Sequence, residues 1–140
     1  LKKEEINFGY RHTSLDSASI IIKARFSFKY KTQSKIRNKQ RDIIRQKNLS
    51  QPSASKTGGS TFTNPLNGKA WKLIDKLGYR GKKFGGAMIS SKHTNFIINH
   101  KNASALDIEL LAEEIRQKTK KKFDINLNWE IKRIGQFKKI

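Results

Sequence analysis

The chain contains no cysteine, one methionine and two prolines, and it has 11 acidic residues against 31 lysines and arginines. The absence of cysteine excludes disulfides, thiolate metal sites and a cysteine nucleophile, and it is typical of a reducing compartment. The three histidines, His12, His93 and His100, lack a close metal-ligand spacing, so we expect no metal site. No apolar run approaches the length of a membrane span, and the charged opening residues do not resemble a signal peptide. We therefore expect a cytoplasmic protein without a membrane partner.

The excess of basic residues gives a formal net charge of +20, a balance often found in proteins that bind nucleic acid. Lysine outnumbers arginine, and the lysines are scattered along the chain instead of alternating with aromatic residues in one tract. Most of these charges are then expected on solvated faces, where polyanions bind only non-specifically at low salt. We expect no specific nucleic-acid partner, with a small basic RNA-binding module as the less favoured alternative.

A chain of 140 residues has room for one domain with a buried core. Residues 19–28 alternate apolar and polar side chains, which predicts a half-buried strand. Residues 30–47 are polar and basic, with three isoleucines at helical spacing, and they predict a solvent-exposed connecting helix. Residues 48–59 carry serine, proline and glycine without periodicity and predict a loop, the one plausible domain boundary.

Beyond this loop the pattern alternates helices with strands, which predicts an α+β (mixed α/β) fold. Pro65 suits the first turn of a helix that Gly78 ends. Ser104 and Asp107 predict a capping box for a longer helix. Strands are expected in three stretches, and the last is the clearest because its apolar residues alternate with polar ones: Phe84 to Ser90, Thr94 to Asn99 and Ile125 to Ile131.

One stretch, Gly58-Gly59-Ser60-Thr61-Phe62-Thr63-Asn64, has the composition of a ligand-binding turn. Its two glycines allow a ligand to approach the backbone closely. Ser60 supplies a hydroxyl, and Asn64 lies just before an expected helix start, where free N–H groups favour an anion. The same composition is common in plain surface turns, so the stretch by itself leaves both interpretations open.

Ser60 and two other residues, Arg11 and Glu130, have side chains that could act together in catalysis. Arg11, beside Tyr10 in a loop, can hold a carboxylate with two hydrogen bonds. Ser60 can supply a proton to a carbanion-like centre, and Glu130 lies on the polar face of the last expected strand. Each is also explained as a surface arginine, a turn serine or a solvated carboxylate. None of the three alone predicts catalysis.

Seven segments occur in an order and at spacings that resemble one known family. They are Tyr10-Arg11-x-x-Ser14, Gly59-Ser60-x-Phe62-x-Asn64-Pro65, Ala70-Trp71-x-Leu73-Ile74-Asp75, Gly85-Gly86-Ala87, His93-x-Asn95-Phe96-x-Ile98-Asn99, Asn102-Ala103 and Glu130-Ile131. Together they resemble the UDP-N-acetylenolpyruvoylglucosamine reductases, also called UDP-N-acetylmuramate dehydrogenases, over nearly the whole chain. The compact substrate region is similar to the shorter type of this family.

The resemblance implies an FAD enzyme of peptidoglycan precursor synthesis. It implies that NADPH reduces the flavin, which passes hydride to C3 of the substrate UDP-N-acetylglucosamine enolpyruvate and gives UDP-N-acetylmuramate. The family motifs place the arginine that grips the substrate at Arg11, the serine that protonates C2 at Ser60, and the acid beside the substrate carboxylate at Glu130. Asn64 matches the position that contacts the diphosphate, and Tyr10 is expected to line the same pocket.

The chain departs from the family pattern at two places. Thr63 stands where family members often carry lysine, which removes one phosphate contact. The family's FAD-binding segments, a Gly-x-Gly-Ser-Asn turn and a Pro-Gly-x-x-Gly-Gly loop, precede the matched region and do not occur in this sequence, which begins with leucine. We therefore expect a C-terminal part of the reductase that is inactive in isolation.

The resemblance also implies a division of the chain. Residues 1–30 would form the end of the FAD-binding domain, residues 31–52 a connecting helix and loop, and residues 53–140 the substrate-binding domain. A catalytically inactive remnant that still binds nucleotide sugars is the main alternative. The sequence does not predict an oligomeric state.

Overall fold

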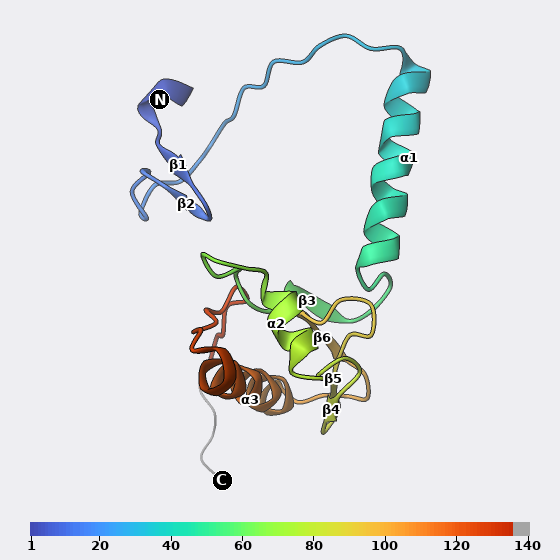
Figure 1. Cartoon of the computed structure of the whole chain (residues 1–140). Helices are drawn as coiled ribbons and strands as arrows, with labels where there is room; N and C mark the ends of the chain where they lie inside the picture. Colours follow the sequence, from blue (N-terminus) through green and yellow to red (C-terminus); the bar gives the residue numbers. More distant parts are fainter. Residues whose placement is uncertain (136–140) are drawn as a thin grey trace.

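The computed structural model describes residues 1–135, so the last five residues of the expected substrate-binding domain lie outside the described residues. The N-terminal part holds a short 3-10 helix, Lys3–Glu5, and a two-stranded hairpin formed by β1 (Phe8–Gly9) and β2 (His12–Thr13). An extended segment leads from this hairpin to helix α1 (Gln33–Ser50), which runs down toward the rest of the chain (Figure 1). The remaining elements form the part of the molecule that has a buried core.

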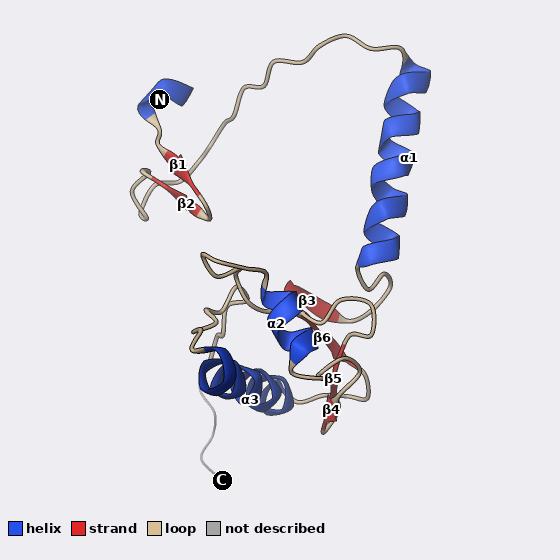
Figure 2. Ribbon diagram, in the orientation of Figure 1, coloured by secondary structure: helices blue, strands red, loops and turns tan. Residues whose placement is uncertain are grey.

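A four-stranded antiparallel sheet and two helices make up this second part (Figure 2). The strand order is β3-β6-β5-β4, with bounds Thr57–Ser60, Phe96–Asn99, Ala87–Ile89 and Lys83–Phe84. Helices α2 (Ala70–Lys76) and α3 (Ala105–Phe123) each contribute fully buried side chains to one core with the strands. The predicted α+β fold is therefore confirmed.

The capping box predicted at Ser104 is present at the start of α3. The Ser104 hydroxyl accepts a hydrogen bond from the Asp107 N–H at 3.0 Å, and the Asp107 carboxylate accepts one from the Ser104 N–H at 3.0 Å. The same carboxylate accepts a third bond from the Gly86 N–H, at 3.1 Å. These hydrogen bonds lower the pKa of Asp107, and the bond from Gly86 has the largest effect. One carboxylate thus ties the start of α3 to the turn between β4 and β5.

The strand expected over residues 19–28 is not formed, so that prediction is wrong for this structure. Ile20 and Ile22, which alternation places on the buried face, are 86% and 93% exposed. An alternating pattern forms a strand only where a neighbouring strand completes its hydrogen bonds, and no strand within residues 1–135 pairs with this segment. The connecting helix is confirmed as α1, whose residues are all exposed.

Three boundaries in the second part differ from the sequence predictions. The expected loop ends earlier, because β3 begins at Thr57. Pro65 does not lie in a first helical turn, since α2 begins at Ala70. The stretch 125–131 keeps its predicted alternation of burial as far as Trp129, with Leu127 1% exposed, whereas Glu130 is half-buried like its neighbours. The stretch forms only a single bridge, between Trp129 and Phe62, instead of a strand.

None of the helices in residues 1–135 combines the length and the apolar composition that a crossing of the lipid bilayer requires.

Glu114 on α3 gives the fold a specific pH dependence. Its Oε1 accepts hydrogen bonds from Lys118 at 2.8 Å, from the Tyr79 hydroxyl at 2.7 Å and from Lys82 at 2.9 Å. These contacts lower the pKa of Glu114 from 4.5 to about 2, and the bond from Lys118 has the largest effect. Because the folded-state pKa is the lower one, the stabilisation is fully present above the unfolded-state pKa and is lost as pH falls toward the folded-state pKa.

We therefore expect Glu114→Gln to lower the free energy of unfolding by about 1 kcal/mol near neutral pH and to flatten its pH dependence in acid. Urea unfolding at about pH 6 and about pH 3 measures this, since the wild type should lose more stability between these pH values than the variant. Glu4→Gln, at an exposed glutamate, is the control and should follow the wild type. Parallel pH profiles of wild type and Glu114→Gln would contradict this explanation.

Candidate active site

Arg11 and Glu130, from opposite ends of the chain, form an ion pair. Arg11 lies in the turn of the β1–β2 hairpin with a left-handed φ of 59°. Glu130 follows the bridge residue Trp129, and its N–H donates to the carbonyl of Thr61 at 2.9 Å. The Arg11 side chain stays 55% exposed and that of Glu130 21% exposed, so both can still meet a ligand.

Tyr10 and Asn64 form a second contact beside this pair. The Tyr10 hydroxyl accepts hydrogen bonds from the backbone N–H and the Nδ2 of Asn64, both at 3.3 Å. The Asn64 Oδ1 accepts a bond from the N–H of Ala70, the first residue of α2, at 3.1 Å. The bond from the Asn64 backbone and then Arg11 lower the pKa of Tyr10. The hairpin is thus joined to the start of α2.

Three of the predicted site residues line one cavity of about 490 Å³. It is lined by Tyr10, Arg11, Thr63, Asn64, Pro65, Leu66, Gly68, Lys69 and Asn128. Two cations, two amides and a phenol therefore face this space, and none of the acidic side chains in residues 1–135 lines it. Such a donor set favours an anionic ligand that carries phosphate or carboxylate groups.

Ser60 lies at the end of β3, opposite Phe96 of β6. The register shifts between Thr57 and Ser60, and Gly59 has a φ of 92°, a conformation that glycine adopts without strain. The Ser60 side chain is half-buried, and no hydrogen bond of its hydroxyl is seen among residues 1–135. Within the described part of the chain, the Ser60 hydroxyl is therefore a free donor.

The structure brings Tyr10, Arg11, Asn64 and Glu130 together through direct contacts. It connects Ser60 to them through the backbone, since the next residue, Thr61, accepts the hydrogen bond of Glu130. Within the described residues no hydrogen bond joins Ser60 directly to Arg11 or Glu130.

Two polar residues of the cavity were missed by the sequence analysis, Lys69 and Asn128. Asn128 lies on the polar face of the alternating stretch that also carries Glu130, so the alternation of apolar and polar residues could have identified it as a candidate. Lys69, just before α2, had no signal among the many scattered lysines.

The glycine-rich segment of the described residues does not form a site for the diphosphate of FAD. The glycine-rich segment 58–60 pairs with β6, and α2 begins ten residues later, so the strand-turn-helix arrangement that binds a dinucleotide diphosphate is not formed here. Residues 1–135 also contain no group of three or more histidine, aspartate and glutamate side chains placed to hold a metal ion.

The fold and the cavity define a class: a small α+β domain with a cavity lined by cations and amides beside an arginine–glutamate pair. Residues 51–134 match the family model described as UDP-N-acetylenolpyruvoylglucosamine reductase, C-terminal domain. The chain belongs to the UDP-N-acetylenolpyruvoylglucosamine reductase family, as the sequence resemblance indicated.

Curated relatives carry the same name. The chain is 46% identical over 136 residues to the UDP-N-acetylenolpyruvoylglucosamine reductase of Novosphingobium aromaticivorans, covering 97% of this chain and 46% of the relative. It is 45% identical over 134 residues to that of Rickettsia prowazekii, covering 96% of this chain and 45% of the relative. The crystal structure of the Thermus caldophilus reductase matches with a TM-score of 0.71 and 33% identity, over 91% of this chain and 46% of that chain. The chain thus spans about half the length of the relatives that it matches.

Proposed function

We propose that this chain provides the substrate-binding half of a UDP-N-acetylmuramate dehydrogenase. The reaction is the FAD-dependent, NADPH-using reduction of UDP-N-acetylglucosamine enolpyruvate to UDP-N-acetylmuramate in peptidoglycan precursor synthesis. The observation that carries the proposal is the Arg11–Glu130 ion pair beside the polar cavity that Tyr10, Arg11 and Asn64 line. In this proposal residues 1–30 end the FAD-binding domain, residues 31–52 connect, and residues 53–140 bind the substrate.

The residues of this chain would act on the substrate half of the reaction. A reduced flavin, bound by the other half of the enzyme, would supply the hydride to C3. Negative charge then develops at C2 and on the adjacent carboxylate, where the Arg11 guanidinium can hold it with two hydrogen bonds. The free hydroxyl of Ser60 donates the proton to C2, which completes the reduction of the double bond. Glu130 faces the substrate carboxylate, and Arg11 between the two acids offsets their repulsion.

The polar cavity would hold the diphosphate of the substrate. Asn64 can donate from Nδ2, and Tyr10 fixes the orientation of its amide. Lys69 lines the same cavity and supplies a positive charge where Thr63 replaces the lysine of other family members. A diphosphate bound there would be neutralised without a dedicated glycine-rich loop.

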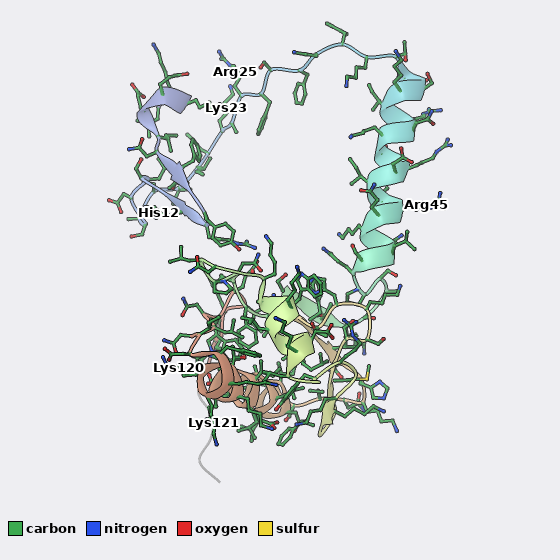
Figure 3. The ribbon with its side chains drawn as sticks, viewed as in Figure 1. His12, Lys23, Arg25, Arg45, Lys120 and Lys121 are labelled. Carbon is green, nitrogen blue, oxygen red and sulfur yellow. The ribbon has the colours of Figure 1, made fainter. Side chains whose placement is uncertain are left out.

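RNA binding is the alternative that the net charge of +20 favours. Figure 3 shows labelled basic residues on three separate parts of the chain: Lys23 and Arg25 on the extended segment, Arg45 on α1, and Lys120 and Lys121 on α3. These five cations lie on separate parts of the chain and do not form one binding surface.

Calorimetric titration separates the two functions. A specific site should bind the UDP-sugar substrate with an affinity that changes less than about tenfold between about 50 and 200 mM salt, whereas RNA affinity should fall by roughly a thousandfold. A catalytically inactive remnant that still binds nucleotide sugars would give the same titration result. Activity must therefore be measured in a protein of full length.

For this purpose the part of the Novosphingobium aromaticivorans reductase that this chain does not cover can be joined to the N-terminus of the chain. The 46% identity over the shared region supports the exchange. We call this chimera the reconstituted reductase.

Purified alone, the chain is expected to carry no flavin, because its described residues provide no dinucleotide site. The visible absorbance of the purified protein checks this, with the reconstituted reductase as the positive control that should hold about one FAD per chain. Stoichiometric flavin on the chain alone would contradict the proposed division into two halves.

A further inference from the structure

Asn95 makes a two-point contact with the segment that carries the proposed proton donor. Its Oδ1 accepts a hydrogen bond from the Phe62 N–H at 3.0 Å, and its Nδ2 donates to the Phe62 carbonyl at 2.8 Å. The Asn95 carbonyl also accepts a bond from the Thr61 N–H at 2.7 Å. Asn95 is 4% exposed and Phe62 is 1% exposed, so water does not compete for these hydrogen bonds.

The position of Asn95 explains why an amide is used there. The β3–β6 pairing ends at Ser60 opposite Phe96, and the chain continues from Ser60 outside the strand. A side-chain amide has the same donor and acceptor as a peptide group, so Asn95 extends the pairing to Phe62. Without it, the buried N–H and C=O of Phe62 would both lose a partner, which proteins rarely tolerate.

The other side of this segment is also fixed. Phe62 pairs with Trp129, their ring centroids 5.5 Å apart, and the Thr63 N–H donates to the Asn128 carbonyl at 2.9 Å. Asn95 is itself held in place, because the preceding Thr94 is fully buried and donates to the Trp71 carbonyl at 2.6 Å. The peptide of Phe62 therefore lies between a rigid amide and the stretch that presents Glu130.

We propose that Asn95 is a positioning residue of the active site. By fixing the Phe62 peptide, it sets the place of Ser60, two residues before, and of Asn64, two residues after. This inference rests on the proposed function, because Ser60 and Asn64 have their roles only there. Asn95 does not touch the substrate and acts through the backbone.

Asn95→Asp in the reconstituted reductase tests the proposal, because the variant keeps the shape and the acceptor but places a carboxylate oxygen against the Phe62 carbonyl. We expect kcat for product formation to fall about a hundredfold, KM for the UDP-sugar to rise less than about tenfold, and flavin reduction by NADPH to stay within about twofold. Asn99→Asp is the matched control, since Asn99 ends β6 and its one side-chain hydrogen bond within residues 1–135 is accepted from the Ala103 N–H, at 2.9 Å. It should match the wild type.

A second variant and a second measurement cover the case in which the buried aspartate prevents folding. Asn95→Ala removes the amide without adding charge, and it should show the same split between the two half-reactions. In the chain alone, this variant should also speed the hydrogen exchange of the Phe62 amide at least about tenfold, with the Ala103 amide unchanged.

Two outcomes would overturn the inference. One is a folded Asn95 variant with the kcat of the wild type, and the other is equal loss in both half-reactions, which marks a structural role alone. A wild-type reconstituted reductase without turnover would instead contradict the proposed function. In that case the hydrogen exchange of the Phe62 amide would still test whether Asn95 holds the Phe62 peptide. An exchange rate in Asn95→Ala equal to that of the wild type would overturn the claim that Asn95 holds it.

Discussion

Ser60→Ala in the reconstituted reductase is expected to lower product formation by about a thousandfold while flavin reduction by NADPH stays within about twofold of the wild type. The reason is that the proposed proton transfer to C2 belongs only to the second half-reaction. The lost hydroxyl makes no hydrogen bond among the described residues, so the substitution should leave stability nearly unchanged. Stopped-flow measurement of the two half-reactions separates these effects.

The matched control is Ser91→Ala, at an exposed serine whose carbonyl, and not its side chain, contacts Arg80. Both half-reactions of this variant should match those of the wild type. Equal losses in both half-reactions of Ser60→Ala would contradict the role of Ser60 as proton donor. Such a result would make Ser60 a structural residue of β3.

Gly86→Ala is expected to destabilise the fold by about 3 kcal/mol or more and to lower Tm by roughly 10 °C or more. A Cβ at this position would lie 2.3 Å from the Lys101 carbonyl oxygen and 2.5 Å from the Ala103 nitrogen. Both are backbone atoms, so neither can move aside as a flexible side chain does. The Gly86 carbonyl also accepts hydrogen bonds from His100 and Lys101, at 2.9 and 3.0 Å, which any shift would break.

Gly68→Ala provides the comparison for this effect. An added Cβ there meets no atom within 4 Å, so the free energy of unfolding should change by less than about 0.5 kcal/mol. Thermal unfolding of both variants by circular dichroism measures the difference. Equal Tm values for Gly86→Ala and the wild type would show that the loop after β6 is not packed as described.

Helices α1 and α3 were predictable from sequence because their signals are local. The capping box of Ser104 and Asp107 and the basic last turn fix both ends of α3 within the helix itself. Helix α1 was likewise predicted from its own sequence, and all of its residues are exposed. Local signals of this kind do not depend on the tertiary structure.

The strands were predicted less well because a strand depends on its partner. The stretch 19–28 has a clear alternating pattern and still forms no strand, since none of the described strands pairs with it. The stretch 84–90 was predicted as one strand but folds into β4 and β5 around Gly85, whose φ of 51° makes the turn. The glycines in this stretch did mark a close backbone approach, at Gly86.

In the candidate site, too, residues with local sequence signals were predicted and contacts made only on folding were not. The residue types and motif order identified Tyr10, Arg11, Ser60, Asn64 and Glu130 as candidates, and the structure joins four of them by contacts. Neither Arg11 nor Glu130 has a local signal for its partner, because the two meet only after the chain folds. The roles of Asn95 and Lys69 were not predictable for the same reason.

Steady-state turnover of the reconstituted reductase tests the proposed function most directly. With FAD bound, NADPH oxidation should depend on added UDP-N-acetylglucosamine enolpyruvate and should yield UDP-N-acetylmuramate in equal amount. Fully FAD-loaded protein in which the substrate causes no NADPH oxidation would contradict the claim that this chain provides the substrate half of the enzyme.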